Sequence, residues 1–464
     1  MIFSAANVIL EKTELPVLPL PEQCPSVPDS CYAARLEQLR AKMAEKELDF
    51  IVIYGDREHY SNFKYFVGFE PRFEEGLLII PRKGKSHLWL GNECFPMHPW
   101  AKLDAEPHLY PAFSLPNQPM AGHVLPSQLY AASGIWAGAR VGVVGWKLFR
   151  PEHGPDYQTM LELSDYLAQP LKELAGQVIN AAELLIAPNG GIRTINSADE
   201  IALLEYGACW ASECVRSALE RMEEGQTEQE AANLMAARGL QYTCHPLVHS
   251  GVNSDRGLIS PTCVPIHNGV PICISTGLEG GLTCRGGYYA DGAGVLPEDQ
   301  RDYVEKLAAP YFAVVASWYS SLRIGVTGGE MYDLVNSVFP QQRYGWGLNP
   351  GHLTAYEEWL SALNYPGSDI PYRSGMIVQM DIIPGLAPYS APNAEDGIAI
   401  ADEALRAELS EKYPAVFDRM QRRRKVMEKV IGIPLAPELL PMSNMCGVYA
   451  PFMKEPSLIF KIKP

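Results

Sequence analysis

One histidine with two neighbouring glutamates is the first group of residues that could do chemistry. In the stretch NPGHLTAYEEW, His352 is followed by the adjacent pair Glu357 and Glu358. An imidazole nitrogen can bind a metal ion, and a carboxylate close to it can act as a general base. Alternatively, the two glutamates lie in the solvated first turn of a helix, EEWLSAL, where acidic side chains suit the helix dipole. The stretch by itself leaves both interpretations open.

Acidic residues also interrupt apolar stretches on either side of this histidine. Asp291 follows GGYYA, Asp381 lies within IVQMDIIPG, and Glu395 precedes the apolar run GIAIAD. A carboxylate buried in a strand is costly to desolvate unless it is paired, hydrogen-bonded or bound to a metal. Each one alone is most simply a salt-bridged or turn-capping acid. Together with His352 they form a set of oxygen and nitrogen donors that suits Mn, Fe, Co or Zn.

The first half of the chain must fold around short apolar strands. The chain has 464 residues, which suggests two or three domains. Residues 1–30 are rich in proline and predict an extended N-terminal arm. Helical spacing of apolar residues from Leu36 to Leu48, followed by the strand-like runs FIVIY, GLLIIP, SHLWLG and RVGVVG, predicts an α/β domain over residues 31–190.

The second half begins at a boundary marked by APNGGIRTINS, where proline and paired glycines occur. Ser197 and Glu200 predict a capping box that starts a long helix. A second helix is expected over residues 226–238 and a third over 299–322. Strands are expected at PLVHSG, VPICIST, GGYYADGAG, GMIVQMDIIPG and GIAIAD. These patterns predict an α+β domain over residues 191–464.

Composition excludes some classes of partner. Hydrophobic residues make up 47% of the chain and charged residues 20%, which is typical of a globular protein with a sizeable core. The net charge of -16 argues against nucleic acid or an anionic membrane as a partner. The ten cysteines form no C-x-x-C pair and indicate scattered thiols of a reducing compartment. Because no signal peptide or membrane span is recognised either, we expect a cytoplasmic protein.

The ordered motifs resemble those of the creatinase, aminopeptidase P, prolidase and methionine aminopeptidase superfamily. The similar stretches are RLEQLRAKMAEKELDFIVIYGDRE, RTINSADEIALLEYGACWASECVRSALERMEEGQTEQEAA, SGVNSDRG, LRIGVTGGEMYDLVN, SGMIVQMDIIPG and NAEDGIAIAD. The resemblance covers most of the chain. It implies an α+β pita-bread catalytic domain preceded by a smaller α/β creatinase-type N-terminal domain. It also implies a homodimer that acts on a small molecule or dipeptide.

Enzymes of this superfamily bind metal through Asp, Asp, His, Glu and Glu, in that order. The first position, counted from Gly269, falls on Ser275, so that ligand is absent. The stretch GYYAD places the second on Asp291, which makes GLEGGLTCRGG a hairpin insertion. The two glutamate positions fall on Asp381 and Glu395. The resemblance therefore implies one divalent ion, Mn, Fe, Co or Zn. A second ion is the alternative if an unaligned ligand completes the set, with Glu279, Cys273, Cys284 and His267 in the right region.

The histidine position has two possible alignments, on Trp346 or on His352, and we prefer His352. The stretch GHLTAYEEW is then similar to the H-G-x-G-L-x-D-E-W segment of the pita-bread lyase that cleaves dimethylsulfoniopropionate. In that enzyme the aspartate is the catalytic base. The resemblance places Glu357 in that role and matches Glu358 and Trp359 to the residues that follow.

Three further residues are candidates for binding substrate, namely His249, Arg285 and Tyr288. A core or turn histidine is the simpler interpretation of His249, and Arg285 could meet an anionic group. Creatine hydrolysis is poorly supported, because Leu258 and Ile259 stand where creatinase carries its histidine.

Three functions remain open. The first is a metal-dependent hydrolase that acts on a C–N bond of a small amide or dipeptide. The second is a lyase in which a carboxylate removes a proton α to a carbonyl. The third is a binding protein with a degraded site.

Overall fold

Two compact units make up the chain. The computed structural model describes residues 1–254 and 256–463, so Asp255, in the SGVNSDRG stretch quoted above, lies outside the described residues. The small unit comprises Val27–Thr194, and the large unit comprises Met1–Ser26 together with Ile195–Pro464.

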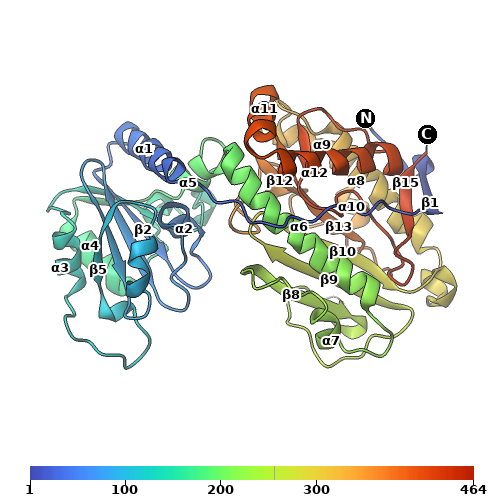
Figure 1. Ribbon diagram of the computed structural model, residues 1–464, viewed down its shortest axis with the longest axis horizontal. Coiled ribbons are helices and arrows are strands. Elements are labelled where there is room, and N and C mark those ends of the chain that lie inside the picture. The colour runs from blue at the N-terminus through green and yellow to red at the C-terminus, as the bar shows by residue number, and fades with distance from the viewer. Residues whose placement is uncertain (255, 464) are drawn as a thin grey trace. The chain divides into compact units, whose positions relative to one another are not determined.

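A mixed sheet of six strands, in the order β5-β4-β3-β2-β6-β7, forms the centre of the small unit (Figure 1). The predicted strands FIVIY, GLLIIP, SHLWLG and RVGVVG are confirmed as β2, β3, β4 and β6. The strands are β2 (Phe50–Gly55), β3 (Gly76–Pro81), β4 (Ser86–Leu90), β5 (Ala105–Leu109), β6 (Arg140–Val144) and β7 (Gln177–Asn180). The helices are α1 (Asp29–Glu45), α2 (Ser61–Val67), α3 (Pro126–Ala132), α4 (Asp165–Leu174) and α5 (Glu183–Ile186).

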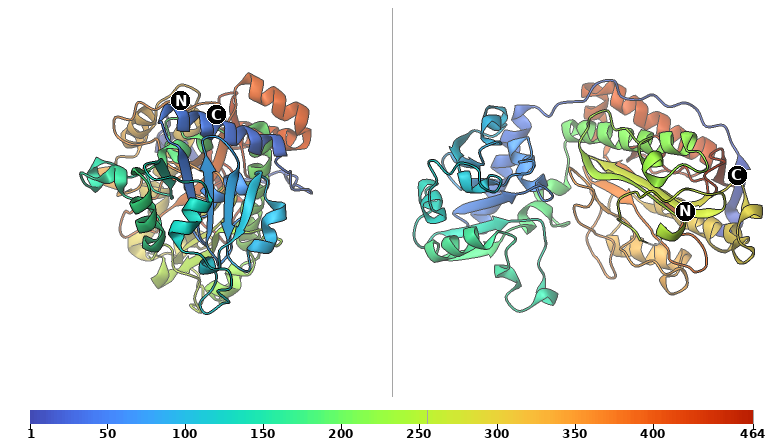
Figure 2. Two further views of the ribbon diagram at one scale, coloured as in Figure 1. Left: turned by 90° about the vertical axis from the view of Figure 1, so that its left-hand side faces the viewer. Right: turned by 90° about the horizontal axis from the view of Figure 1, so that it is seen from below.

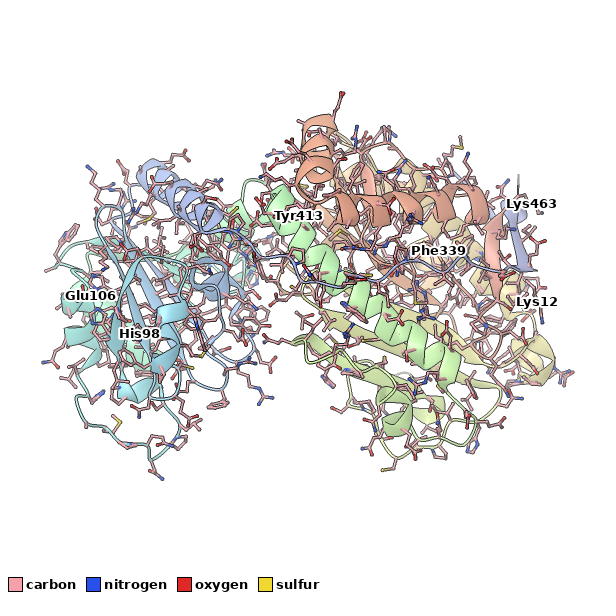
Figure 3. The ribbon with its side chains drawn as sticks, in the orientation of Figure 1. Lys12, His98, Glu106, Phe339, Tyr413 and Lys463 are labelled. Carbon is pink, nitrogen blue, oxygen red and sulfur yellow. The ribbon has the colours of Figure 1, made fainter. Side chains whose placement is uncertain are left out.

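Near its start, the chain contributes a strand to the large unit. Strand β1 (Val8–Lys12) pairs antiparallel with β15 (Leu458–Ile462), so that Val8 lies opposite Ile462. The ammonium of Lys12 lies 2.9 Å from the Glu455 carboxylate. Figure 2 marks the two chain ends in this unit, and Figure 3 labels Lys12 and Lys463. The predicted arm over residues 1–30 therefore contains a strand, and its last residues begin α1.

Helix α6 (Ala198–Arg221) is the long helix that the sequence predicts after residue 191. Its capping box is confirmed, because the Ser197 hydroxyl accepts from the Glu200 amide and the Glu200 carboxylate accepts from the Ser197 amide. In its middle, buried Glu205 pairs with two arginines of α12 (Pro414–Lys425). Glu205 Oε2 lies 2.5 Å from Arg419 Nη2, and Oε1 lies 2.7 Å from Arg423 Nη1. These charges neutralise one another where α6 and α12 meet.

The main sheet of the large unit has seven strands. Its order is β11-β12-β13-β10-β9-β8, with β14 paired to β13. The strands are β8 (Tyr242–Ser250), β9 (Val270–Leu278), β10 (Gly281–Tyr289), β11 (His352–Leu353), β12 (Ile377–Met380), β13 (Asn393–Ile400) and β14 (Leu439–Pro441).

Strands β9 and β10 form one central hairpin joined by Glu279 and Gly280. Gly280 has a φ of +105°, and a Cβ on it would lie 1.9 Å from the Leu204 carbonyl oxygen, so glycine is required there. The stretch GLEGGLTCRGG is therefore this turn and the start of β10. Our prediction that it is an inserted hairpin is wrong.

The remaining helices of the large unit differ in length from the predictions. The expected helix over residues 299–322 is a π-helical turn, η10 (Val304–Ala308), followed by α8. The expected helix over 226–238 shrinks to α7. The helices are α7 (Glu228–Ala232), α8 (Ala309–Ser321), α9 (Gly328–Val338), α10 (Gln341–Tyr344), α11 (Glu403–Lys412) and α12. Among the described residues, none of the helices is long and apolar enough to cross a membrane.

The two faces of the main sheet have different chemistry. On one face, Ile272 and Ile274 of β9 pack with Val248 of β8 against Ala211 and Val215 of α6. Side chains alternate along a strand, so the intervening residues point to the opposite face. That opposite face carries buried polar side chains, among them His249, Ser275 and Glu395.

Candidate metal centre

Three buried side chains from three strands converge on the face of the sheet opposite α6. His352 lies on β11, Asp381 directly follows β12, and Glu395 lies on β13. One donor atom from each lies within 4.8 Å of the others. The register explains the convergence, because His352 is opposite Gln379 and Gln379 is opposite Gly397. Asp381 is two positions after Gln379, and Glu395 is two positions before Gly397. Both side chains therefore lie on the same face of the sheet as His352.

Glu358 is the predicted glutamate that contacts this cluster. Its Oε1 atom lies 3.0 Å from His352 Nε2, and Glu395 Oε1 lies 3.8 Å from the same nitrogen. The His352 ring stacks on Trp359, with centroids 4.1 Å apart and planes 17° apart. The side chain of Glu358 is 27% exposed whereas that of His352 is 0% exposed. Glu358 therefore lies between the buried cluster and solvent.

Glu357 lies in a turn beside its neighbour. Its backbone carbonyl accepts hydrogen bonds from the Thr354 hydroxyl at 3.0 Å and the Ala355 amide at 3.2 Å. Its role as a base stays a prediction. The alternative, that EEWLSAL begins a helix, is wrong, because the described residues 357–363 form bends and a bridge between Leu353 and Ser361.

Burial and crowding shift the pKa values of all three cluster residues. Burial raises the pKa of Asp381 to about 6, with His352 opposing and Glu358 adding to the shift. Burial, and then the Asp381 carboxylate, raises the pKa of Glu395 well above its ordinary value. Burial opposes a charged His352 ring, but Glu358 and Glu395 raise its pKa well above the usual range. The ionised carboxylates are therefore unfavourable in this cluster unless a cation stabilises them.

The residues present fit a divalent metal ion. Among the described residues, Asp381 Oδ1 and His352 Nε2 are buried without a directed hydrogen bond, although Nε2 makes the ion-pair contact with Glu358. Buried polar atoms are normally satisfied, so two such atoms within one cluster indicate a ligand. Gln379 Nε2 donates to Glu395 Oε1 at 3.2 Å and holds that carboxylate in place. Imidazole and carboxylate donors suit Zn, Mn, Fe and Co.

Asp291 is not part of the cluster, and its prediction as a ligand is corrected. It is exposed and follows the far end of β10. At about 3.3 Å per residue, Tyr289 at that end is roughly 16 Å along the strand from Cys284. The turn between β9 and β10 is short, so the residue opposite Glu395 is Cys284 and not Asp291.

Cys273 and Cys284, two of the unaligned candidate metal ligands, lie on the same face of the sheet as the cluster. Cys284 is directly opposite both Glu395 and Ser275 in the register, and Cys273 is two residues before Ser275. The two sulfur atoms are 3.4 Å apart. This contact lowers the pKa of Cys273 and raises that of Cys284 well above its ordinary value. The sequence signal for this pair of cysteines is the Glu279-Gly280 turn, because two residues of this kind between two strand-like segments predict a tight hairpin.

The three predicted substrate-binding residues are placed differently from one another. His249 is opposite Cys273, so it shares the cluster's face, and its Nε2 atom lies 2.6 Å from the Ile259 carbonyl oxygen. Arg285 points to the α6 face and pairs with buried Asp396 at 2.6 Å, which corrects its assignment to substrate. The Tyr288 hydroxyl is buried, donates to Gln300 Oε1 at 2.8 Å and accepts from the Ser390 amide. Of the three, His249 shares the cluster's face but lies on β8, which β9 and β10 separate from Glu395 on β13.

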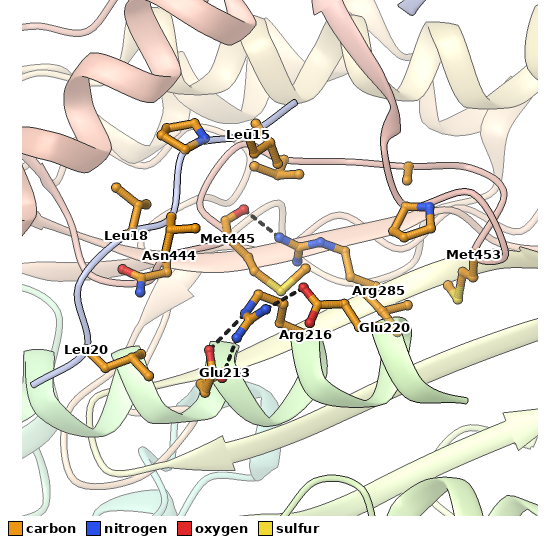
Figure 4. Close-up of a pocket in the computed structure, with 16 residues that line it drawn as sticks. Leu15, Leu18, Leu20, Glu213, Arg216, Glu220, Arg285, Asn444, Met445 and Met453 are labelled. Atoms are coloured by element: carbon orange, nitrogen blue, oxygen red, sulfur yellow. Dashed lines mark hydrogen bonds and ion pairs between the residues drawn. The ribbon is translucent and has the colours of Figure 1, made fainter. Parts of the chain in front are cut away.

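An apolar cavity of about 270 Å³ lies on the other side of the sheet (Figure 4). It is enclosed by the N-terminal segment, α6 and the chain around Met445. Arg216 pairs there with Glu213 and Glu220, so its charge is neutralised within α6. The residues that line the cavity include Leu15, Leu18, Leu20, Leu219, Arg285 and Met453. The cavity is separate from the His352 cluster.

Comparisons with known proteins agree with this architecture. A model of the creatinase/prolidase N-terminal domain matches residues 35–93, and a model of the metallopeptidase family M24 matches residues 203–406. The second range contains His352, Asp381 and Glu395. Among curated proteins, no sequence matches this chain.

Solved structures with similar folds are prolidases and dipeptidases. A prolidase from Thermococcus sibiricus has a TM-score of 0.63 at 16% identity, covering 82% of this chain and 96% of its own. An Xaa-Pro dipeptidase from Bacillus anthracis has a TM-score of 0.61 at 16% identity, covering 80% and 96%. A prolidase from Pyrococcus horikoshii has a TM-score of 0.61 at 17% identity, covering 79% and 95%.

The fold and the two matched domains define the class. The chain belongs to the creatinase, aminopeptidase P and prolidase superfamily, with the predicted pita-bread domain after a creatinase-type N-terminal domain. It is a metallohydrolase of the creatinase/aminopeptidase P type.

Proposed function

We propose that the protein is a metal-dependent hydrolase that cleaves a C–N bond of a small substrate, such as a dipeptide or a related amide. The buried cluster of His352, Asp381 and Glu395 is the observation that carries this proposal. The M24 domain and the structural likeness to Xaa-Pro dipeptidases support a peptide-like substrate.

The residues of the cluster have distinct roles in this proposal. His352, Asp381 and Glu395 hold one ion of Mn, Fe, Co or Zn, which when bound polarises a carbonyl and makes water more acidic. Glu358 accepts the proton of the attacking water and passes it to the leaving nitrogen. Trp359 fixes the His352 ring by stacking on it, and Gln379 orients Glu395.

Metal content is the first test of the proposal. We expect about one ion per chain by elemental mass spectrometry, lost in His352→Ala and Asp381→Asn. The matched control is Asp291→Ala, which changes an exposed carboxylate and keeps the ion. Absence of metal from the wild-type protein under every loading condition would overturn the proposal.

Product analysis tests the reaction. We expect the metal-loaded protein to cleave members of a panel of dipeptides and small amides in water enriched in the heavy oxygen isotope. Hydrolysis places one labelled oxygen in the carboxylate product. An alkene product without label would instead assign the lyase function. The homodimer and the cytoplasmic location remain predictions, which sedimentation and cell fractionation would check.

A further inference from the structure

The contact between Cys273 and Cys284 is unusual for a pair of core thiols, because its surroundings are polar. Cys284 is the direct cross-strand neighbour of Glu395, and Cys273 is the direct neighbour of His249. Both sulfur atoms are on the face where His352 and Asp381 bury atoms without a directed hydrogen bond. A packing role would place the thiols among apolar side chains, as on the α6 face of the same strands.

A disulfide is the first alternative, and the register disfavours it. Cys273 is opposite Gly286, two residues beyond Cys284, so the two cysteines occupy diagonal positions. Diagonal Cα atoms lie roughly 7–8 Å apart. A disulfide usually requires about 4.4–6.8 Å between Cα atoms. Bonding the two sulfur atoms directly would therefore require movement of the backbone.

A shared metal ion fits the same geometry. Two thiolates that bind one zinc ion with bonds of about 2.3 Å have sulfur atoms roughly 3.4–3.8 Å apart when the angle between the bonds is about 95–110°. The observed separation of the two sulfur atoms is 3.4 Å. The β9–β10 hairpin places both Cys273 and Cys284 on the face that carries His352, Asp381 and Glu395.

We propose that Cys273 and Cys284 are metal ligands that complete the set formed by His352, Asp381 and Glu395. The proposal rests on the metal centre proposed above and makes it a mixed centre with two thiolates. Each thiol releases its proton to solvent as its sulfur binds the ion. Thiolate donors favour Zn²⁺, Fe²⁺ and Co²⁺ over Mn²⁺ and Mg²⁺, so the protein is expected to select the first group.

The test uses the full-length protein loaded with Co²⁺. We expect an intense near-ultraviolet band from thiolate-to-cobalt charge transfer, roughly halved in Cys273→Ser or Cys284→Ser and abolished in the double variant. The control is Cys446→Ser, a buried cysteine on the opposite side of the sheet whose thiol contacts the Tyr319 hydroxyl. It should keep the whole band.

X-ray absorption of the zinc-loaded wild-type protein needs no variant and covers the case in which a substitution prevents folding. We expect zinc–sulfur distances of about 2.3 Å beside shorter bonds to nitrogen and oxygen. Bound metal with only nitrogen and oxygen neighbours would overturn the cysteine ligands and leave the metal centre standing. Absence of bound metal would overturn the centre itself. A Cys273–Cys284 disulfide that persists in reduced protein would also overturn the cysteine ligands.

Discussion

Glu357 and Glu358 are neighbours in the sequence, but their surroundings differ. The Glu358 carboxylate contacts the Nε2 atom of His352, while the Glu357 carbonyl closes a turn with Thr354 and Ala355. The resemblance to the lyase segment favours Glu357 as the base, whereas the contact with His352 favours Glu358. The two assignments can be separated by matched substitutions.

We predict that Glu358→Gln lowers kcat by about 100-fold or more, because a general base contributes on the order of 10²–10⁴-fold. Glu357→Gln should lower it by less than about tenfold. Steady-state kinetics on a cleaved dipeptide, at equal metal content, makes the comparison. A large loss confined to Glu357→Gln would assign the base to that residue instead.

Arg285 is buried and paired within the protein, so its role is structural and not that of a substrate-binding residue. Its guanidinium contacts the Asp396 carboxylate and the Met445 carbonyl, both at 2.6 Å. We predict that Arg285→Met lowers the free energy of unfolding by about 3–5 kcal/mol, because it leaves Asp396 buried and unpaired. Urea unfolding measures this loss. Unchanged stability with a raised KM would restore the earlier assignment of Arg285 to substrate.

Helices and strands whose sequence signals come from residues close together in the chain were predictable from the sequence. The capping box of Ser197 and Glu200 starts α6 because the serine and glutamate side chains satisfy amides close by in the chain. The apolar runs of β2 and β3 likewise identify buried strands. The sequence singles out Asp381 and Glu395 because acids within apolar strands are rare unless they are paired or bound, and their role as ligands stays a prediction.

The elements that were not predicted depend on distant contacts. Gly280 turns the β9–β10 hairpin close to the Leu204 carbonyl of α6, which an isolated strand pattern does not reveal. That turn decides that Cys284, and not Asp291, faces Glu395. Similarly, EEWLSAL has a helical composition, but it forms bends and the bridge between Leu353 and Ser361 instead of a helix.

Two histidines on the neighbouring strands β4 and β5, His87 and His108, are expected to make the stability of the small unit depend on pH. His87 Nδ1 lies 3.0 Å from His108 Nε2, and burial lowers the pKa of both histidines. A histidine whose pKa is lowered by folding binds a proton more weakly in the folded state. The stability is therefore fully present above the unfolded value of about 6.5 and is lost as the pH falls below it.

We expect the small unit to unfold at a lower temperature at pH 5.5 than at pH 7, with a smaller decrease in His108→Gln. Calorimetry of the two proteins at both pH values measures the difference. Two equal decreases would show that other groups cause the effect.

At the scale of the whole molecule, the large unit is built from both ends of the chain. Strand β1 pairs along its length with β15, and the Lys463 amide donates to the Asn7 carbonyl oxygen at 2.8 Å. We predict that deleting residues 1–12 lowers the free energy of unfolding of the large unit by about 3 kcal/mol, since several ladder hydrogen bonds are lost. Calorimetry should show the transition of the small unit unchanged. A loss confined to the small unit would contradict this.

The pairing of β1 with β15 also has a consequence for biosynthesis. A ribosome makes β1 (Val8–Lys12) well before β15 (Leu458–Ile462), so the nascent β1 lacks its partner strand while the intervening residues are synthesised. Until then it presents unpaired backbone groups of the kind that promote association between chains. A protein synthesised slowly, or stalled before residue 458, would therefore rely on chaperones to protect this strand.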